Sequence, residues 1–295
     1  MRFDIFVGID WSGAKGHAHR GLSIFVCYAG NEVPQKINPP HGKKAFSRQD
    51  IIDVIDDLAC QGRVLVGIDF AFAYPVDEAG HYFPELDQKA YQPEDAFGLW
   101  ALIDRLNQGA PDYYGGLIWD DPIYGAYYNA PSGRKGARFA SRRRATEIAA
   151  SAIKSPSPTF NCVGPAGVGT GSLAGMRLCH AFQSKASIWP FSSLPDAPVT
   201  LVEIFPSYYF KMAGIHPVKG AQAQVPSLNQ ALGFFQTQAV DDDFIAYGPD
   251  ADDADALISA AALRALSAVP HIWDIHEKAM REGWIFGVTS DKTSS

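Results

Sequence analysis

The tetrapeptide Val-Gly-Ile-Asp occurs twice in this chain, and each copy closes a strongly apolar run. The first copy belongs to FVGIDWSGAKG, which starts at Phe6, and the second to LVGIDFAFAYP, which starts at Leu65. In both, the aspartate, Asp10 or Asp69, stands where a strand gives way to small, aromatic or turn-forming residues. Strands buried on both faces are typical of α/β proteins, in which the carboxyl ends of parallel strands share one edge of the sheet. We therefore expect the two aspartates to meet at one edge.

The hydrophobic pattern predicts an α/β fold with a mixed five-stranded sheet, made of three antiparallel strands plus parallel strands and flanked by helices. The antiparallel strands are expected at 3–10, 20–29 and 32–37, with a turn at Gly30-Asn31, and the parallel strands at 63–69 and 198–205. Helices are expected at 47–60, 94–107, 206–213, 226–237, 252–268 and 273–282. Ser47, with Asp50 three residues on, has the pattern of a helix N-cap.

The least regular part of the chain is 108–198, which we interpret as an elaborated insertion of helices and loops within a single domain spanning 1–295. It contains the glycine-rich stretch VGPAGVGTGSLAGM at 163–176. This stretch lacks the Gly-Lys-Ser/Thr ending of a P-loop, and we interpret it as a plain or flexible loop. The aromatic stretch 113–128 is either core or a contact surface.

The composition limits the class of function. The net charge of −7 argues against indiscriminate binding to nucleic acid, although it allows one local basic patch. No apolar run is long enough to cross a bilayer, and the start of the chain lacks a signal-peptide pattern. The four cysteines form no Cys-x-x-Cys pair, which indicates reduced thiols. We expect a cytoplasmic protein without membrane contact, and the oligomeric state is not indicated.

Acidic residues stand at several predicted element ends. Besides Asp10 and Asp69, Glu203 lies near the end of PVTLVEIF, and Asp252 and Asp255 are spaced to share one face of a late helix. Carboxylates crowded at low dielectric repel one another, which divalent cations relieve, and oxygen ligands favour Mg²⁺ or Mn²⁺. The competing interpretation is ordinary turn formation at strand ends and acids in the first turn of a helix.

The whole pattern resembles the ribonuclease H-like fold, and within it the RuvC-type Holliday-junction resolvases. It is most similar to the domain of unknown function 429 family, regarded as nucleases of this fold. The matching pieces span nearly the whole chain: GIDWSGAKG, VGIDFAFA, SRRRATE, the glycine-rich loop, VEIFPSYYF, DADDADAL and EGWIFGV. The resemblance implies a metal-dependent nuclease that hydrolyses phosphodiester bonds of DNA or RNA with two Mg²⁺ or Mn²⁺ ions.

The resemblance also implies roles for individual residues. Asp10 would be shared by both ions, Asp69 would hold the ion on the leaving-group side, and Asp252 with Asp255 the ion on the water side. Glu203 has no counterpart in the resolvases but matches the family's Val-Glu-x-x-Pro pattern, so its role as ligand or supporting residue stays open. Resolvases carry glutamate where this chain has Asp69.

The chain has one basic run, which is a candidate phosphate-binding patch. Its members are Arg134, Lys135, Arg138, Arg142, Arg143 and Arg144, and Lys15 is a further candidate close to Asp10. The alternative is a solvated helix face partly neutralised by Glu147. His17 and His19 have no third ligand at a suitable spacing, so we interpret them as exposed hairpin residues.

Two other classes of function stay open. An actin-like ATPase or phosphotransferase has the same kind of first strand, although no second phosphate-binding motif follows here. A non-catalytic interaction module with this fold is the other.

Overall fold

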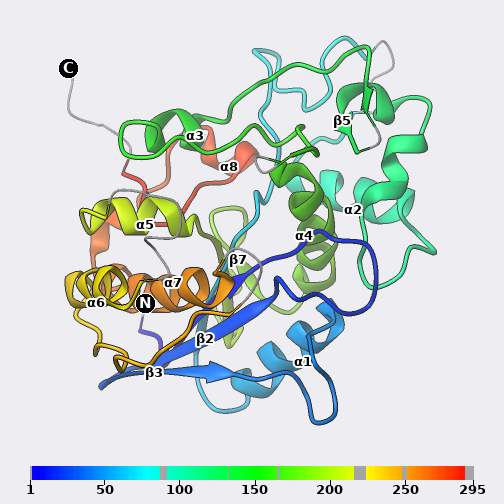
Figure 1. The fold of residues 1–295 in the computed structure, drawn as a ribbon. Coiled ribbons are helices and arrows are strands. Elements are labelled where there is room, and N and C mark those ends of the chain that lie inside the picture. Colours follow the sequence, from blue (N-terminus) through cyan, green and yellow to red (C-terminus); the bar gives the residue numbers. More distant parts are fainter. Residues whose placement is uncertain are drawn as a thin grey trace, which may run out of the picture.

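A six-stranded mixed sheet lies at the centre of the molecule (Figure 1). The computed structural model describes residues 2–86, 92–131, 133–164, 167–215, 224–247 and 251–289. The strands, in their order across the sheet, are β3 (Asn31–Ile37), β2 (Ser23–Tyr28), β1 (Ile5–Asp10), β4 (Val64–Ile68), β8 (Val199–Glu203) and β7 (Ser187–Ile188). The pairs β1–β2 and β2–β3 are antiparallel, and β1–β4, β4–β8 and β8–β7 are parallel. The five expected strands are present, and the short edge strand β7 was not expected.

The two Val-Gly-Ile-Asp copies lie side by side in register. Gly8 pairs with Gly67, and Ile9 pairs with Ile68, across the parallel β1–β4 ladder. The ladder continues past β4, because the backbone N–H of Asp69 donates to the carbonyl of Ile9 at 3.1 Å. The expectation that both aspartates reach one sheet edge is confirmed.

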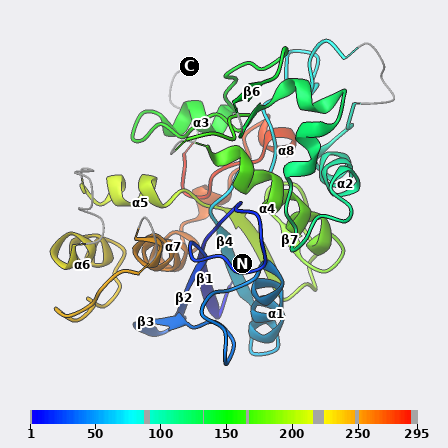
Figure 2. The same cartoon turned by 45° about the vertical axis from the view of Figure 1, so that its right-hand side comes forward.

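Each face of the sheet is covered by its own set of helices (Figure 2). Alternate residues of β1 point to opposite faces, so that Val7 joins one hydrophobic core and Phe6 the other. The first face packs against α1 (Arg48–Ala59), α2 (Ala96–Leu106) and α4 (Val168–Phe182). The second packs against α5 (Pro206–Met212), α6 (Val225–Phe234) and α7 (Asp252–Leu266). The result is a three-layer α/β architecture.

Helix α1 begins as its sequence predicts. The Ser47 hydroxyl accepts from the backbone N–H of Asp50, and the Asp50 carboxylate accepts from the Ser47 backbone N–H at 2.8 Å. Ile51, Ile55 and Leu58 line the face of α1 that is buried against the sheet. This capping box and apolar stripe are the two signals on which the expectation depended.

The interpretation of 163–176 as a loop is wrong for its second half, because α4 begins at Val168. Glycine is a poor helix former, but here it permits close packing. A Cβ atom on Gly169 would lie 2.5 Å from the Thr159 carbonyl oxygen, and one on Gly175 would lie 2.3 Å from the Phe70 ring. Pro165 and Ala166 of this stretch lie outside the described residues.

The rest of 108–198 consists of short elements. They are the 3-10 helices η2 (Gly116–Asp120) and η3 (Tyr124–Tyr127), the hairpin strands β5 (Asn129–Ala130) and β6 (Arg134–Lys135), the helix α3 (Ala145–Ala150) and the edge strand β7 of the central sheet. Tyr124, Tyr127 and Tyr128 are buried, and their rings pack around Phe83 and Phe160. For these three aromatics the core interpretation is therefore correct.

The expected helix at 273–282 is mostly absent. A 3-10 helix η5 (Pro270–Trp273) and a short helix α8 (Ala279–Glu282) flank an irregular stretch instead. The backbone after α8 runs beside β8, where the Phe286 N–H donates to the Glu203 carbonyl at 2.8 Å. Among the described residues, no helix is long and apolar enough to cross a membrane. All four cysteines are free thiols.

Candidate functional site

Four aspartates gather where β1 and β4 end and α7 begins. Asp10 is the last residue of β1, Asp69 follows β4 directly, and Asp252 and Asp255 occupy the first turn of α7. Asp10 and Asp252 are largely buried, with exposed fractions of 9% and 8%, and Asp69 and Asp255 are half-buried. The structure therefore brings together the four aspartates that the sequence singled out.

The position of α7 depends on a glycine of the repeated motif. A Cβ atom on Gly8 would lie 2.1 Å from the Ala256 carbonyl oxygen and 2.5 Å from the Ala260 nitrogen. Helix α7 thus lies directly on the backbone of β1, with its first turn projecting beyond the strand end. A second glycine, Gly21, approaches from the β1–β2 connection, where its Cβ would be 3.8 Å from an oxygen of Asp252.

The aspartates raise one another's pKa values. Burial raises the pKa of Asp10 well above its usual range, and the charges of Asp255 and Asp69 and a hydrogen bond with Asp252 raise it further. Burial also raises the pKa of Asp69, to which Asp255 and Glu203 contribute. Carboxyl groups that are this close together in a partly buried site repel one another when charged, so the cluster favours protons or cations.

The donor atoms suit a hard cation, since all of them are carboxylate oxygens. Among the described residues, no group of three or more His, Cys, Asp or Glu side chains is arranged so that it could hold a metal ion. Within the cluster, the electrostatic environment of Asp10 is affected by each of the three other aspartates.

Asp253, between these acids in the chain, is in a different environment. Its carboxylate accepts from the Ser23 hydroxyl at 2.6 Å, from Lys36 Nζ at 2.6 Å and from the Tyr247 backbone N–H at 3.1 Å. These donors balance its charge. Asp253 therefore fastens α7 to the antiparallel strands, whereas its neighbours Asp252 and Asp255 face the cluster.

Glu203 is engaged in a buried ion pair. Two nitrogens of Arg144 donate to its carboxylate at 2.5 and 2.7 Å, and the Phe72 backbone N–H donates to it at 3.0 Å. Arg144 is 2% exposed and also donates to Glu147 at 2.8 Å. The two glutamates keep the pKa of Arg144 above its usual range despite burial, so it stays charged. Glu203 thus holds the backbone just after Asp69.

All members of the basic run are candidate phosphate ligands by sequence. Among them, Arg144 is buried in the structure. Arg142 is half-buried and donates to the Pro75 and Tyr82 carbonyls at 3.2 and 2.6 Å. Arg138 and Arg143 are exposed, although each also donates to a carbonyl, of Glu85 and Pro156 respectively. Their phosphate-binding role stays a prediction.

The exposed Lys15 lies 5.9 Å from the centre of the Tyr114 ring. At the start of the run, Arg134 forms an ion pair with Asp120 at 2.8 Å, and Lys135 lies over the Phe139 ring. Phosphate binding by these residues also stays a prediction.

The interpretation of His19 as an exposed hairpin residue is wrong. His19 is 2% exposed, and its Nε2 lies 2.8 Å from a carboxylate oxygen of Asp112. The buried Arg48 links the same pair to the loop after Asp10, because it donates to the carbonyls of Ser12, Ala14 and Asp112 at 2.6–2.9 Å. Sequence spacing could not reveal this network, since its members are far apart in the chain. His17 is exposed, as expected.

The glycine-rich start of α4 packs against both strand ends. The Trp11 indole N–H donates to the Gly171 carbonyl at 3.0 Å, and the Ala71 N–H donates to the Ser172 hydroxyl at 3.1 Å. Trp11 follows Asp10, and Ala71 is two residues after Asp69. Helix α4 thereby holds both aspartate loops from the side opposite α7.

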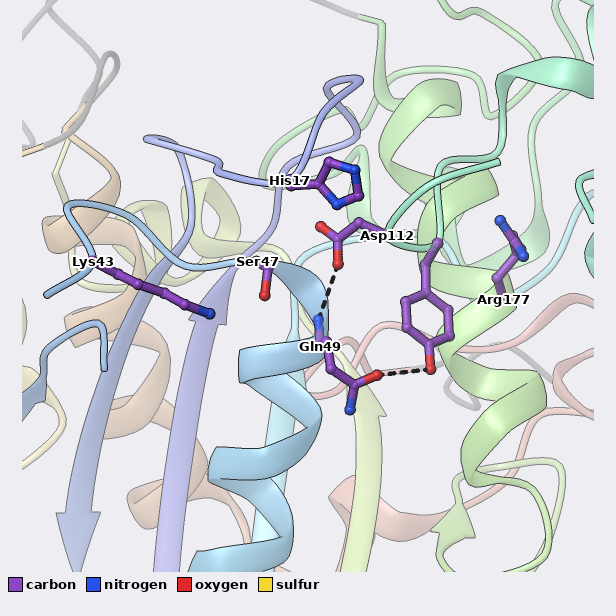
Figure 3. Close-up of a pocket in the computed structure, with 7 residues that line it drawn as sticks. His17, Lys43, Ser47, Gln49, Asp112 and Arg177 are labelled. Atoms are coloured by element: carbon purple, nitrogen blue, oxygen red, sulfur yellow. Dashed lines mark hydrogen bonds between the residues drawn. The ribbon is translucent and has the colours of Figure 1, made fainter. Parts of the chain in front are cut away.

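A hollow of about 630 Å³ opens beside the loop that follows β1 (Figure 3). Its lining residues are His17, Lys43, Ser47, Gln49, Asp112, Tyr113 and Arg177. None of the four clustered aspartates lines it, so it is a separate surface feature beside the site.

Comparisons of the chain with protein-family models, with curated proteins and with solved structures each found no match.

Proposed function

We propose that this protein is a ribonuclease H-like nuclease that hydrolyses phosphodiester bonds of nucleic acid with Mg²⁺ or Mn²⁺ held by Asp10, Asp69, Asp252 and Asp255. The observation that carries the proposal is the convergence of four aspartates from three separate elements at one sheet edge. Neighbouring like charges at a partly buried site are costly unless the site serves to bind cations.

The topology supports the ribonuclease H-like part of the proposal. The order β3-β2-β1-β4-β8, with three antiparallel strands followed by parallel ones, agrees with the arrangement that the sequence resemblance implies. The late helix α7 delivers its two aspartates to the end of β1, also as the resemblance implies. The short strand β7 extends this sheet at one edge.

The residues of the cluster fit the proposed ions in donor type. When bound, two divalent ions supply an activated water and stabilise charge on the leaving oxygen. Asp10 is the carboxylate best placed to be shared, because it interacts with each of the three other aspartates.

Glu203 acts in this proposal as a supporting residue. Its carboxylate is occupied by Arg144 and by the Phe72 N–H, so it positions the chain that follows Asp69. Its negative charge also reaches Asp69 and strengthens the preference of that site for a cation.

The test is cleavage of labelled single-stranded, duplex and branched DNA and RNA with Mn²⁺ or Mg²⁺. We expect wild-type protein to cleave at least one substrate and Asp10→Asn to be at background, while Asp57→Asn, an exposed residue on α1, retains wild-type activity. Both variants should give the wild-type circular dichroism spectrum. Absence of cleavage by the wild type across the panel would contradict the proposal.

The same protein preparations separate the two alternatives. An actin-like ATPase should be stabilised against heat by ATP and Mg²⁺, whereas a nuclease should be indifferent to ATP. A non-catalytic module should bind its partner equally well as the wild-type chain and as the Asp10→Asn variant, and neither form should show turnover.

A further inference from the structure

Three adjoining hollows, which together we call the groove, follow one another along the surface and end near the start of α7. The hollow of Figure 3 shares His17 and Lys43 with a second hollow of about 430 Å³. The second shares Arg20 and Lys44 with a third of about 600 Å³. Because each hollow shares lining residues with the next, the three lie next to one another along the β1–β2 connection and the loop before α1.

The groove is basic, although the chain as a whole has a net charge of −7. Arg20 and Lys44 are exposed, and neither takes part in an ion pair within the described ranges. Lys36 and Lys43 also line the groove, but each is paired with an aspartate, Asp253 and Asp50 respectively, so Arg20 and Lys44 carry its unbalanced positive charge. Because the protein as a whole is acidic, such a local basic surface favours binding of a polyanion at this place and does not attract polyanions to the whole protein.

An exposed aromatic ring stands at one end of the groove. Tyr247 lines the third hollow and is 64% exposed, and Lys36 Nζ lies 5.3 Å from the centre of its ring. The backbone N–H of Tyr247 donates to Asp253, which fixes the residue next to the start of α7. An aromatic face beside cations is the arrangement on which unpaired bases stack.

This end of the groove adjoins the aspartate cluster. Asp253 lines the third hollow, and the next residue back in the chain, Asp252, belongs to the cluster. Gly21, adjacent to the groove residue Arg20, lies near Asp252: a Cβ atom on Gly21 would be 3.8 Å from an oxygen of its carboxylate. A strand in the third hollow would thus pass close to the first turn of α7, which carries Asp252 and Asp255.

We propose that this groove binds an unpaired strand of nucleic acid, with Arg20 and Lys44 contacting phosphates and Tyr247 stacking on a base. The inference rests on the proposed function for its link to cleavage, and it names the substrate as a single strand or a single-stranded segment. A base within a duplex is already stacked on its neighbours, so only an unpaired base gains from Tyr247. The groove is distinct from the basic run at 134–144.

The experiment measures binding of a fluorescein-labelled oligothymidylate by anisotropy, in EDTA so that cleavage plays no part. We expect Arg20→Ala/Lys44→Ala to weaken binding about tenfold or more and to reduce the log–log salt slope by about 1.4, for two lost phosphate contacts on a single strand. Tyr247→Ala should weaken binding about tenfold without changing the salt slope. Binding to a labelled duplex should be insensitive to Tyr247→Ala.

Two matched pairs serve as comparisons. Arg2→Ala/Arg63→Ala removes the same charge from two exposed residues that precede β1 and β4, at the ends of these strands away from the aspartates. This variant should leave the binding affinity and the salt slope unchanged. Arg138→Ala/Arg143→Ala tests the basic run. An equal loss of binding affinity in all three double variants would indicate general electrostatic attraction. A loss in the Arg138→Ala/Arg143→Ala variant alone would place the bound strand at the basic run. Either result overturns the proposal, as does unaltered binding by the groove variants.

The outcomes distinguish this proposal from the proposed function. If groove variants lose binding while wild-type protein and Asp10→Asn bind alike and neither cleaves, the groove inference stands and the nuclease proposal fails. If wild-type protein cleaves in Mn²⁺ but the groove variants bind and cleave normally, the nuclease proposal stands and the groove inference fails. Circular dichroism and thermal melts of each variant verify that the loss is not one of folding.

Discussion

Gly8 of β1 and Ala256 of α7 are in direct backbone contact: a Cβ atom on Gly8 would lie 2.1 Å from the Ala256 carbonyl oxygen. This contact sets the height of α7 above the sheet, and with it the distance of Asp252 and Asp255 from Asp10. The glycine of the first Val-Gly-Ile-Asp copy therefore has a structural task separate from that of the aspartate. In the second copy Gly67 serves a similar purpose, since its Cβ would lie 2.5 Å from Ile204 and 2.8 Å from Leu263.

The first prediction follows from this contact. Gly8→Ala should destabilise the protein by about 2–4 kcal/mol, because α7 must move away from β1 to admit a methyl group. Gly233→Ala is the matched control: this glycine is exposed on α6 with no atom within 4 Å of its Cβ position, so alanine should be neutral or stabilise by up to about 1 kcal/mol. Urea unfolding of both variants measures the difference. Equal effects at the two positions would contradict the packing argument.

The second prediction concerns the charge of the aspartate cluster. The folded-state pKa of Asp10 is raised above that of the unfolded chain, so the folded state keeps a proton that the unfolded state has lost. Its contribution to stability is therefore lost as the pH rises from about 4 through the raised pKa. In EDTA at neutral pH, the free energy of unfolding of Asp10→Asn should exceed that of wild type by about 1–3 kcal/mol. This difference should disappear below about pH 4.

Asp253→Asn is the comparison for that experiment. Its carboxylate already has Ser23 and Lys36 as donors, so neutralising it should lower the free energy of unfolding, in the opposite direction to Asp10→Asn. Thermal or denaturant unfolding as a function of pH measures both variants. If Asp10→Asn also destabilised the metal-free protein at neutral pH, mutual repulsion would not be the dominant force in the cluster.

The third prediction tests the buried ion pair between Arg144 and Glu203. Arg144→Met should cost about 3–5 kcal/mol, because it leaves two buried glutamates without their cation. Adding Glu203→Gln to Arg144→Met should recover part of that loss, so the two effects should be strongly non-additive. A double-mutant cycle by denaturant unfolding measures the coupling. Additive effects would mean that the two residues do not depend on each other.

The fourth prediction concerns Asp112, which ties the 108–198 segment to the loop after β1. Burial alone would raise its pKa, but hydrogen bonds from His19 and from the backbone N–H groups of Arg48 and Gln49 outweigh burial and lower it. A lowered folded-state pKa gives stability that is present above about pH 4 and is lost as the pH falls through the folded-state value. Asp112→Asn should thus destabilise by about 1–3 kcal/mol at pH 7. A pH series of urea melts should show the difference shrinking in acid, and a constant difference would argue against the ionic contribution.

The sequence alone determined the strands of the central sheet and most of the surrounding helices, because apolar runs and capping residues are local signals. It also determined that Asp10 and Asp69 reach one edge of the sheet and that Asp252 and Asp255 share one face of a helix. Parallel strands bring their carboxyl ends to the same edge, and a three-residue spacing keeps two acids on one helical face. That the helix lies over the end of β1 depends on the distant contact between Gly8 and Ala256, which local signals do not contain.

Only the tertiary structure decided what depends on distant partners. The glycines of α4 predict a loop by local propensity, yet they form a helix because Thr159 and Phe70 leave no room for side chains. Arg144 belongs to a basic run in sequence, but its position opposite Glu203 buries it. The basic groove joins Arg20 and Lys44 to Tyr247, residues that are remote in the chain and that the sheet and α7 bring together. Local patterns predict elements, whereas charges and close contacts acquire their role from the neighbours that folding supplies.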